Sequence, residues 1–197
     1  MPKVVDHEQR RRELAEAVWR VIRRNGVDGA SVRTVAQEAG WSAGALRHYF
    51  RTQSELLDFA IELAAERIRQ RVGALELADD PRRAVEQLLS QLLPLDDERR
   101  AENEVWLAFT ARALIDPHLR ARYAEIDDEL RAASLRAVEM LGLPSGRGRA
   151  LEAERLHALL DGLALHGAMP PERLPPRRIA AVLRRHLDKL ASEAPRR

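Results

Sequence analysis

The segment spanning residues 31–50, with the sequence SVRTVAQEAGWSAGALRHYF, constrains the fold most, because it describes two short helices around a tight turn. A first helix capped by Ser31 would end at Gly40. A second helix capped by Ser42 would run to about Tyr49. Such a pair holds together only if its residues meet three packing requirements.

Each of these packing requirements is met by a residue of the right type. The turn must tolerate a left-handed backbone, which Gly40 does. Ala36 is small enough to let the two helices approach, and Leu46 can close a core to which Val32 and Val35 add. This is the helix-turn-helix pattern, in which the second helix lies in the major groove of DNA and the first crosses the backbone. A merely structural helical hairpin is the alternative.

The remainder of the chain is also predicted to be helical. An apolar stripe marks a helix that ends near Gly26, and the capping box at residues 52–55 opens a long helix. Asp80 and Asp116, each followed by proline, and the acidic stretch at Asp96 have the signature of helix starts. Because no stretch alternates with a period of two between turn residues, we expect an all-α protein of about nine helices.

The composition excludes several classes of protein and site. The 197 residues contain no cysteine, which excludes disulfide scaffolds, iron–sulfur clusters, thiol nucleophiles and cysteine-based zinc sites. The formal net charge of +2 says little by itself about nucleic acid. No apolar run approaches membrane-spanning length, and no apolar segment follows the charged start of the chain. We therefore expect a cytoplasmic protein with no membrane partner.

Two short motifs resemble catalytic or metal sites. Residues 40–44 match G-x-S-x-G, but the hydrolase motif needs a strand before its serine and a helix is predicted there. Glu154 and His157 match the E-x-x-H of di-iron bundles, which need a second copy and further glutamates. The six histidines show no metal-ligand spacing. We therefore expect no enzyme activity, no metal and no cofactor.

The helix-turn-helix segment also resembles a known family. Residues 34–50, TVAQEAGWSAGALRHYF, and residues 53–57, QSELL, are similar to the TetR family of bacterial transcription regulators. The strong similarity covers about residues 10–60. The segments EVWLAF at 104–109 and LDGLAL at 160–165 resemble the ligand-sensing half of actinobacterial-type members.

The resemblance implies a division of the chain and a mode of action. Residues 1–53 would form the DNA-binding domain, and residues 54–197 a helical bundle for ligand binding and dimerisation. The expected function is that of a repressor which binds an operator in double-stranded DNA as a homodimer and is released by a small-molecule effector. A ligand would act by moving the helix of residues 52–70 and so changing the distance between the two reading helices. A transcriptional activator and a helical ligand-binding protein without DNA function are the alternatives.

The candidate DNA-binding residues follow from helix N-termini, which can meet phosphates, and from positions that face the groove in the family. They are Ser31, Arg33, Thr34, Ser42, Ala43, Gly44, Ala45, Arg47, His48, Tyr49 and Arg51. Arg47 is the candidate for a bidentate guanine contact, with a phosphate contact or a free surface arginine as the alternatives. His48 and Tyr49 are expected to contact phosphates, and a core role beside Phe50 is the alternative for Tyr49.

Three positions depart from the family pattern. The family usually has tyrosine at the position of Arg47, which changes the expected operator preference. It often has lysine near Gln53, which puts one phosphate contact in doubt. Trp41 replaces the usual small aliphatic residue and is expected to pack rather than to contact DNA.

The second half of the chain offers candidates for an effector pocket, because such pockets are apolar with a few placed polar groups. The candidates are Trp106, Phe109, Arg112 and His166. An ordinary core role is the alternative for Trp106 and Phe109.

The last two helices carry apolar stripes that are expected to form a four-helix dimer interface. Their predicted interface residues are Leu156, Leu160, Leu163, Ile179, Leu183 and Leu187. A two-fold dimer would bind a palindromic operator with half-sites one or more DNA turns apart.

Overall fold

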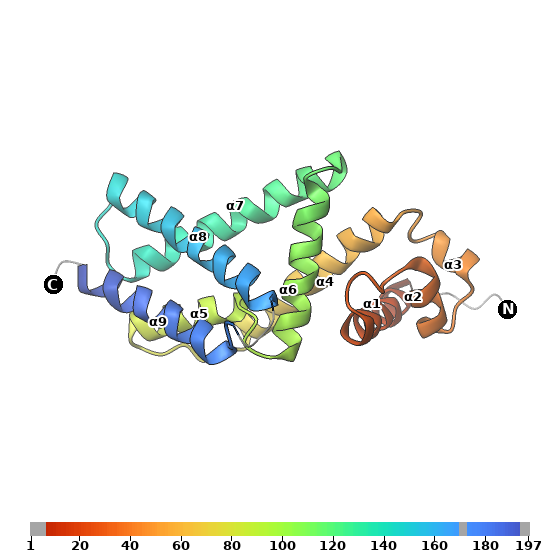
Figure 1. Ribbon diagram of the computed structural model, residues 1–197, viewed down its shortest axis with the longest axis horizontal. Helices are drawn as coiled ribbons and strands as arrows, with labels where there is room; N and C mark the ends of the chain where they lie inside the picture. The colour runs from red at the N-terminus through yellow and green to blue at the C-terminus, as the bar shows by residue number, and fades with distance from the viewer. Residues whose placement is uncertain (1–6, 170–172, 194–197) are drawn as a thin grey trace.

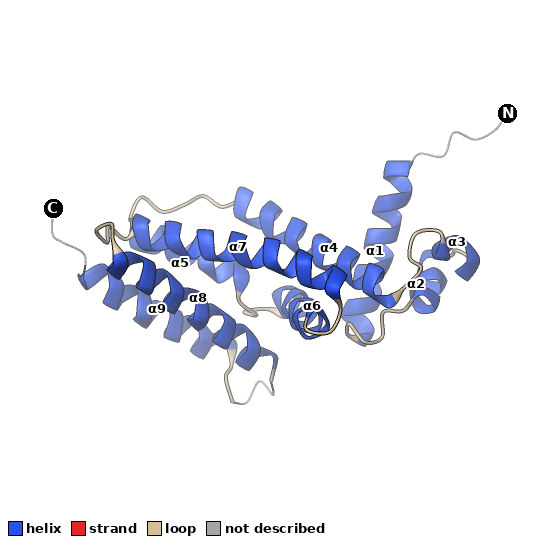
Figure 2. Cartoon of the chain, turned by 90° about the horizontal axis from the view of Figure 1, so that it is seen from above, coloured by secondary structure: helices blue, strands red, loops and turns tan. Residues whose placement is uncertain are grey.

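The computed structural model describes residues 7–169 and 173–193, and this part of the chain is built from helices without any strand (Figures 1 and 2). The helices are α1 (His7–Asn25), α2 (Val32–Ala39), α3 (Ala43–Arg47), α4 (Gln53–Gly73), α5 (Pro81–Leu89), α6 (Asp97–Ala113), α7 (Pro117–Met140), α8 (Arg147–Ala168) and α9 (Pro176–Glu193). A short 3₁₀ turn, η1 (Ser90–Leu92), follows α5. The prediction of an all-α fold with about nine helices is confirmed.

The helices begin where the sequence places a side chain that can accept a hydrogen bond from a free backbone N–H group. Six of the predicted caps form such a bond: Ser31, Ser42, Thr52, Asp80, Asp96 and Asp116. Removing a cap of this kind typically costs about 1 kcal/mol. The starts of α2–α7 are therefore fixed by residues within one helical turn of each start.

The molecule has three parts: the head (α1–α3), the connector (α4) and the body (α5–α9). The head lies at one end of the molecule and α8 and α9 at the other, with the connector and α6 between them (Figure 1). One cluster of buried apolar side chains joins the head, the connector and α6, including Val18, Leu46, Leu56 and Phe109. This cluster crosses the predicted domain boundary at residues 53 and 54, so the head and the connector share one core.

A second buried cluster lies within the body, where α8 and α9 pack against α5 and α7. It contains all six side chains that the sequence had assigned to a dimer interface, and none of them is more than 8% exposed: Leu156, Leu160, Leu163, Ile179, Leu183 and Leu187. The assignment is corrected, because these are core residues of the single chain. The reason is that α5 and α7 of the same chain cover the stripes that the sequence left without a partner.

No helix in the described residues is both long and apolar enough to cross a lipid bilayer.

Candidate nucleic-acid interface

The turn between α2 and α3 has the backbone geometry that its glycine permits. Gly40 ends α2 with φ of 69°, and the N–H of the next residue, Trp41, donates to the Ala36 carbonyl at 2.9 Å. A residue with a Cβ would be strained at this φ. Ala36 is 2% and Leu46 0% exposed, so the small residue and the closing residue lie in the core as predicted. These contacts fix α3 against α2.

The surface of α3 is open and lined by small side chains. Ala43, Gly44 and Ala45 are exposed, and a Cβ built on Gly44 would meet nothing closer than the Ser42 Oγ at 3.9 Å. A DNA backbone or base edge can therefore approach the helix backbone closely. Arg47, in the last turn of α3, is exposed beside this surface.

The hydroxyl groups expected to meet phosphates also build the start of each helix. The Ser31 Oγ accepts from the Thr34 N–H at 3.2 Å, and the Thr34 Oγ1 accepts from the Ser31 N–H at 2.9 Å. The Thr34 hydroxyl donates to the Gly29 carbonyl at 2.7 Å, so its proton is already engaged within the chain. The Ser42 Oγ accepts from the Ala45 N–H at 3.1 Å and is exposed. Of the three hydroxyls, that of Ser42 is the most open to a phosphate.

Trp41, which departs from the family pattern, packs against another aromatic side chain of the head. The rings of Trp41 and Tyr49 lie 5.5 Å apart and tilted by 51°, and the Arg10 guanidinium lies over the Trp41 ring at 5.8 Å. Tyr49 is 39% exposed, so it is a surface residue, whereas its neighbour Phe50 is 5% exposed and belongs to the core. Trp41 is half-buried and packs against Tyr49, which agrees with the expectation that it packs.

Some arginines of the head form ion pairs with Glu38, which we call the clamp, and others have no partner in the described part of the chain. Glu38 on α2 accepts from Arg20 and from Arg24 of α1, each at 2.8 Å, and these bonds hold the pKa of its carboxyl below the usual range. The clamp fixes α2 to α1 and pairs both arginines within the chain. The three arginines among the predicted DNA-contacting residues have no side-chain hydrogen bond or ion pair in residues 7–169 and 173–193, and all are exposed: Arg33, Arg47 and Arg51. The head therefore carries free guanidinium groups on α2, at the end of α3 and just before α4.

Both the helix-turn-helix region and the C-terminal region of the chain match known protein families. Residues 14–67 match the family described as bacterial regulatory proteins, tetR family, and residues 81–192 match the C-terminal region of BetI-type transcriptional repressors. The chain belongs to the TetR family. The BetI-type match replaces the less specific likeness to actinobacterial members in the body.

Individual TetR relatives cover nearly the whole chain. The protein is 41% identical over 198 residues to the HTH-type transcriptional regulator PksA of Bacillus subtilis (strain 168). The matched region covers 98% of this chain and 95% of the relative. A transcriptional regulator from Rhodococcus sp. Rha1 has a TM-score of 0.80 at 33% identity, covering 93% of this chain and 97% of that one. The multidrug binding protein EbrR, solved in complex with imidazole, has a TM-score of 0.65 at 29% identity, covering 94% and 93%. The protein is thus a TetR-family transcription regulator and not an enzyme, as predicted.

The four residues predicted to line an effector pocket do not share a cavity in this TetR member. Phe109 is 0% exposed and belongs to the core, which was its alternative role. Trp106 is half-buried, and its ring stacks on Tyr123 at 5.6 Å. Arg112 is exposed in the last turn of α6, and His166 is exposed in the last turn of α8. Trp106 and Phe109 are neighbours with ring centroids 6.2 Å apart.

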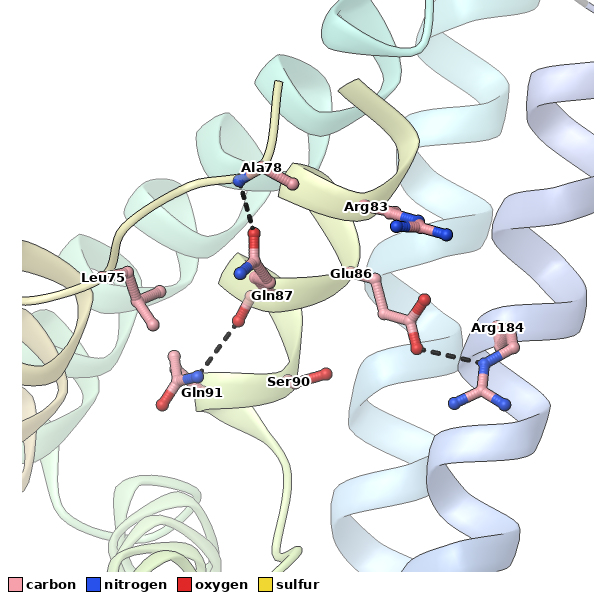
Figure 3. A pocket seen from close by; sticks show the side chains of 8 residues that line it. All are labelled: Leu75, Ala78, Arg83, Glu86, Gln87, Ser90, Gln91 and Arg184. Atoms are coloured by element: carbon pink, nitrogen blue, oxygen red, sulfur yellow. Dashed lines mark hydrogen bonds and ion pairs between the residues drawn. The ribbon is translucent and has the colours of Figure 1, made fainter. Parts of the chain in front are cut away.

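Two shallow cavities do occur in the described part of the chain. One, of about 520 Å³, lies between the α4–α5 segment, α5 and α9 and is shown in Figure 3. Its lining residues are Leu75, Ala78, Arg83, Glu86, Gln87, Ser90, Gln91 and Arg184. The other, of about 510 Å³, lies between the start of α4 and the α6–α7 turn and is lined by Thr52, Gln53, Ser54, Glu55, Arg112, Asp116 and His118. Arg112 is the one predicted pocket residue that lines either cavity.

A polar cluster around the buried His157, between α7 and α8, was not predicted from the sequence. His157 is 6% exposed, and its Nε2 lies 3.2 Å from the Asp127 Oδ1 and 3.4 Å from the Asp161 Oδ2. Burial raises the pKa of the Asp161 carboxyl and that of the nearby Tyr123 hydroxyl. The spacing of four residues between His157 and Asp161 was the available signal. Glu154, the other half of the E-x-x-H motif, pairs instead with Arg131 on α7.

Proposed function

We propose that this TetR-family member is a repressor that binds a palindromic operator as a homodimer in the cytoplasm and is released by a small-molecule effector. The observation that carries the proposal is the open face of α3, where Gly44 and the two alanines beside it allow close approach and Arg47 is unpaired. A small-residue surface on a head that also carries free guanidinium groups suits the major groove and its flanking phosphates.

The proposed contacts divide into base and phosphate contacts. Arg47 would donate to the O6 and N7 of a guanine, the commonest specific contact of arginine in the major groove. Tyr49 and His48 are exposed at the end of α3 and would donate to phosphates, with Arg33 and Arg51 adding charge. These roles predict different mutational effects, because base contacts determine sequence preference whereas phosphate contacts support binding to any sequence.

The homodimer is supported by the outward face of α8. Leu151, Ala158 and Leu165 recur every seven residues and are exposed, and they lie opposite the buried stripe of the same helix. Gly162 lies next to this row, and a Cβ there would meet no atom within 4 Å. Met169 follows at the end of the helix and is 47% exposed. An apolar stripe with a small residue at its centre suits close packing against the same stripe of a second copy.

The effector is proposed to bind in the body, where Trp106 is half-buried next to Tyr123 and the polar cluster of His157. The combination of stacked rings with a few buried polar groups is typical of ligand sites. The relative EbrR is described as a multidrug binding protein and was solved with imidazole, which supports an effector of small-molecule size.

The test is a selection of genomic DNA fragments with the purified protein, followed by titration of the enriched sequence at two salt concentrations. We expect a palindromic site bound by two chains, with an affinity that falls as salt rises. Arg47→Ala should weaken binding, and Arg136→Ala on α7, an equally exposed arginine remote from the head, is the matched control. No enrichment of any sequence at low salt would favour a ligand-binding protein without DNA function. A reporter that rises rather than falls with the protein would indicate an activator.

A further inference from the structure

Glu98, in the first turn of α6, joins three side chains from two other helices. Its carboxylate accepts from the Trp19 Nε1 at 2.5 Å and from Arg23 at 2.7 Å, both on α1 of the head. It also accepts from Arg67 of the connector at 2.5 Å. We call these four residues the Glu98 junction. One carboxylate of the body thus holds both the head and the connector.

The junction is tightened by stacking and burial. The Arg67 guanidinium lies 4.4 Å from the centre of the Trp19 ring, so the same arginine contacts both α1 and α6. Trp19 is 4% exposed, and its indole N–H would lack a partner if the carboxylate were removed. A half-exposed ion pair alone contributes little, but here it is combined with a buried donor and a cation–π contact.

From the junction, a continuous set of contacts runs to the reading helix. α1 carries Trp19 and Arg23 on the side of α6, and Arg20 and Arg24 on the side of α2, where both bind Glu38. α2 in turn packs on α3. This route links α6 to α3 through α1 and does not pass along the connector.

We propose that Glu98 is a positioning residue which fixes the head on the body, so that the two heads of a dimer are held at the separation that the operator requires. This inference rests on the proposed function, because it needs a dimeric protein that binds two half-sites. It assigns to α1 a part in regulation, since a movement of α6 on effector binding would reach the reading helix through the junction. Fixed heads lower the entropic cost of engaging two half-sites together but do not affect the binding of one.

The test compares a full palindromic operator with a DNA duplex that contains a single half-site. Glu98→Gln removes the charge, and Trp19→Phe removes the indole N–H together with part of the ring volume while it keeps an aromatic ring under Arg67. We expect each variant to lose about tenfold in affinity for the full operator and to keep its affinity for the half-site. The double variant should lose no more operator affinity than the single variant with the larger loss, because both substitutions break the same bond between Trp19 and Glu98.

The matched control is Glu104→Gln, which makes the same change on the same helix at a half-buried residue outside the junction. It should bind both duplexes like the wild type. An equal loss on both duplexes would overturn the inference and assign the junction to the stability of the head. Unchanged binding by Trp19→Phe and Glu98→Gln would also overturn it. A wild-type protein that binds neither duplex would overturn the proposed function itself, which separates the two failures.

Discussion

The head exposes small and basic side chains, whereas the outward face of α8 exposes large aliphatic ones. On α3, Gly44 is open to solvent and Arg47 has no partner within the described residues. On α8, Leu151 is 62% and Leu165 45% exposed. The first surface suits a charged partner that comes close to the backbone, and the second suits an apolar partner of similar shape. The two ends of one chain are thus prepared for different partners.

The two regions also differ in what they bury. In the head, Leu46 and Ala36 belong to the core that the head shares with the connector and α6, whereas the face of α3 that carries Gly44 is exposed. In α8, apolar residues occupy two opposite faces, and Leu156 on one of them is 0% exposed. An apolar stripe on a helix indicates that something covers it, but the cover can be the same chain or a second one.

The largest effect is expected from placing a charge on the inner face of α8. Leu156→Asp would bury an unpaired carboxylate among α5, α7 and α9 and should cost roughly 4 kcal/mol or more, a large part of a total stability of about 5–15 kcal/mol. Thermal unfolding followed by circular dichroism should show a protein that is unfolded or nearly so. A well-folded monomer would mean that the inner stripe, and not the outer one, meets a partner.

The matched change on the outer face is expected to separate folding from assembly. Leu165→Asp should leave the chain folded, as circular dichroism would show, because the side chain is already 45% exposed. The dimer should be lost in sedimentation, and operator affinity should fall on the order of a hundredfold because each head then binds alone. A dimer that survives this change would place the interface elsewhere.

In the head, Arg47→Ala should cost about 1–3 kcal/mol of operator affinity if the guanidinium contacts a guanine. The preference for one base pair of the half-site should be relaxed at the same time. Competition titrations with operators altered at single positions provide the measurement. A uniform loss on every sequence would instead assign Arg47 to a phosphate.

The smallest effect is expected from pH, through the clamp between α1 and α2. Because Arg20 and Arg24 lower the pKa of Glu38 in the folded protein, the stabilisation is present above its ordinary pKa and is lost as the pH falls through the lowered value. Glu38→Gln should therefore melt earlier than the wild type at pH 7, and the difference should shrink as the pH falls below the ordinary carboxyl value of 4.5. A difference that is constant with pH would show that the carboxylate charge is not the cause.

Much of the head could be predicted from the sequence because its signals act over a few residues. Ser31 and Ser42 cap the helices that follow them, and Gly40 adopts the positive φ that the turn requires. These outcomes depend on hydrogen bonds and backbone sterics within one helical turn. The exposure of Tyr49 and its contact with Trp41 were harder to predict, since both depend on how α3 packs against the rest of the head.

The sequence by itself determined the helices, their starts and the family, and with them the class of function. The tertiary structure decided which face of α8 is core, because Leu156 and Leu165 lie on the same helix and differ only in what packs against them. It also decided the contacts of Glu98, which the sequence predicts only as part of an acidic helix start. Its bond to Trp19 joins residues 79 positions apart, and no local pattern carries information over that separation. Local interactions fix the elements, and burial between distant segments decides which of their surfaces remain available to a partner.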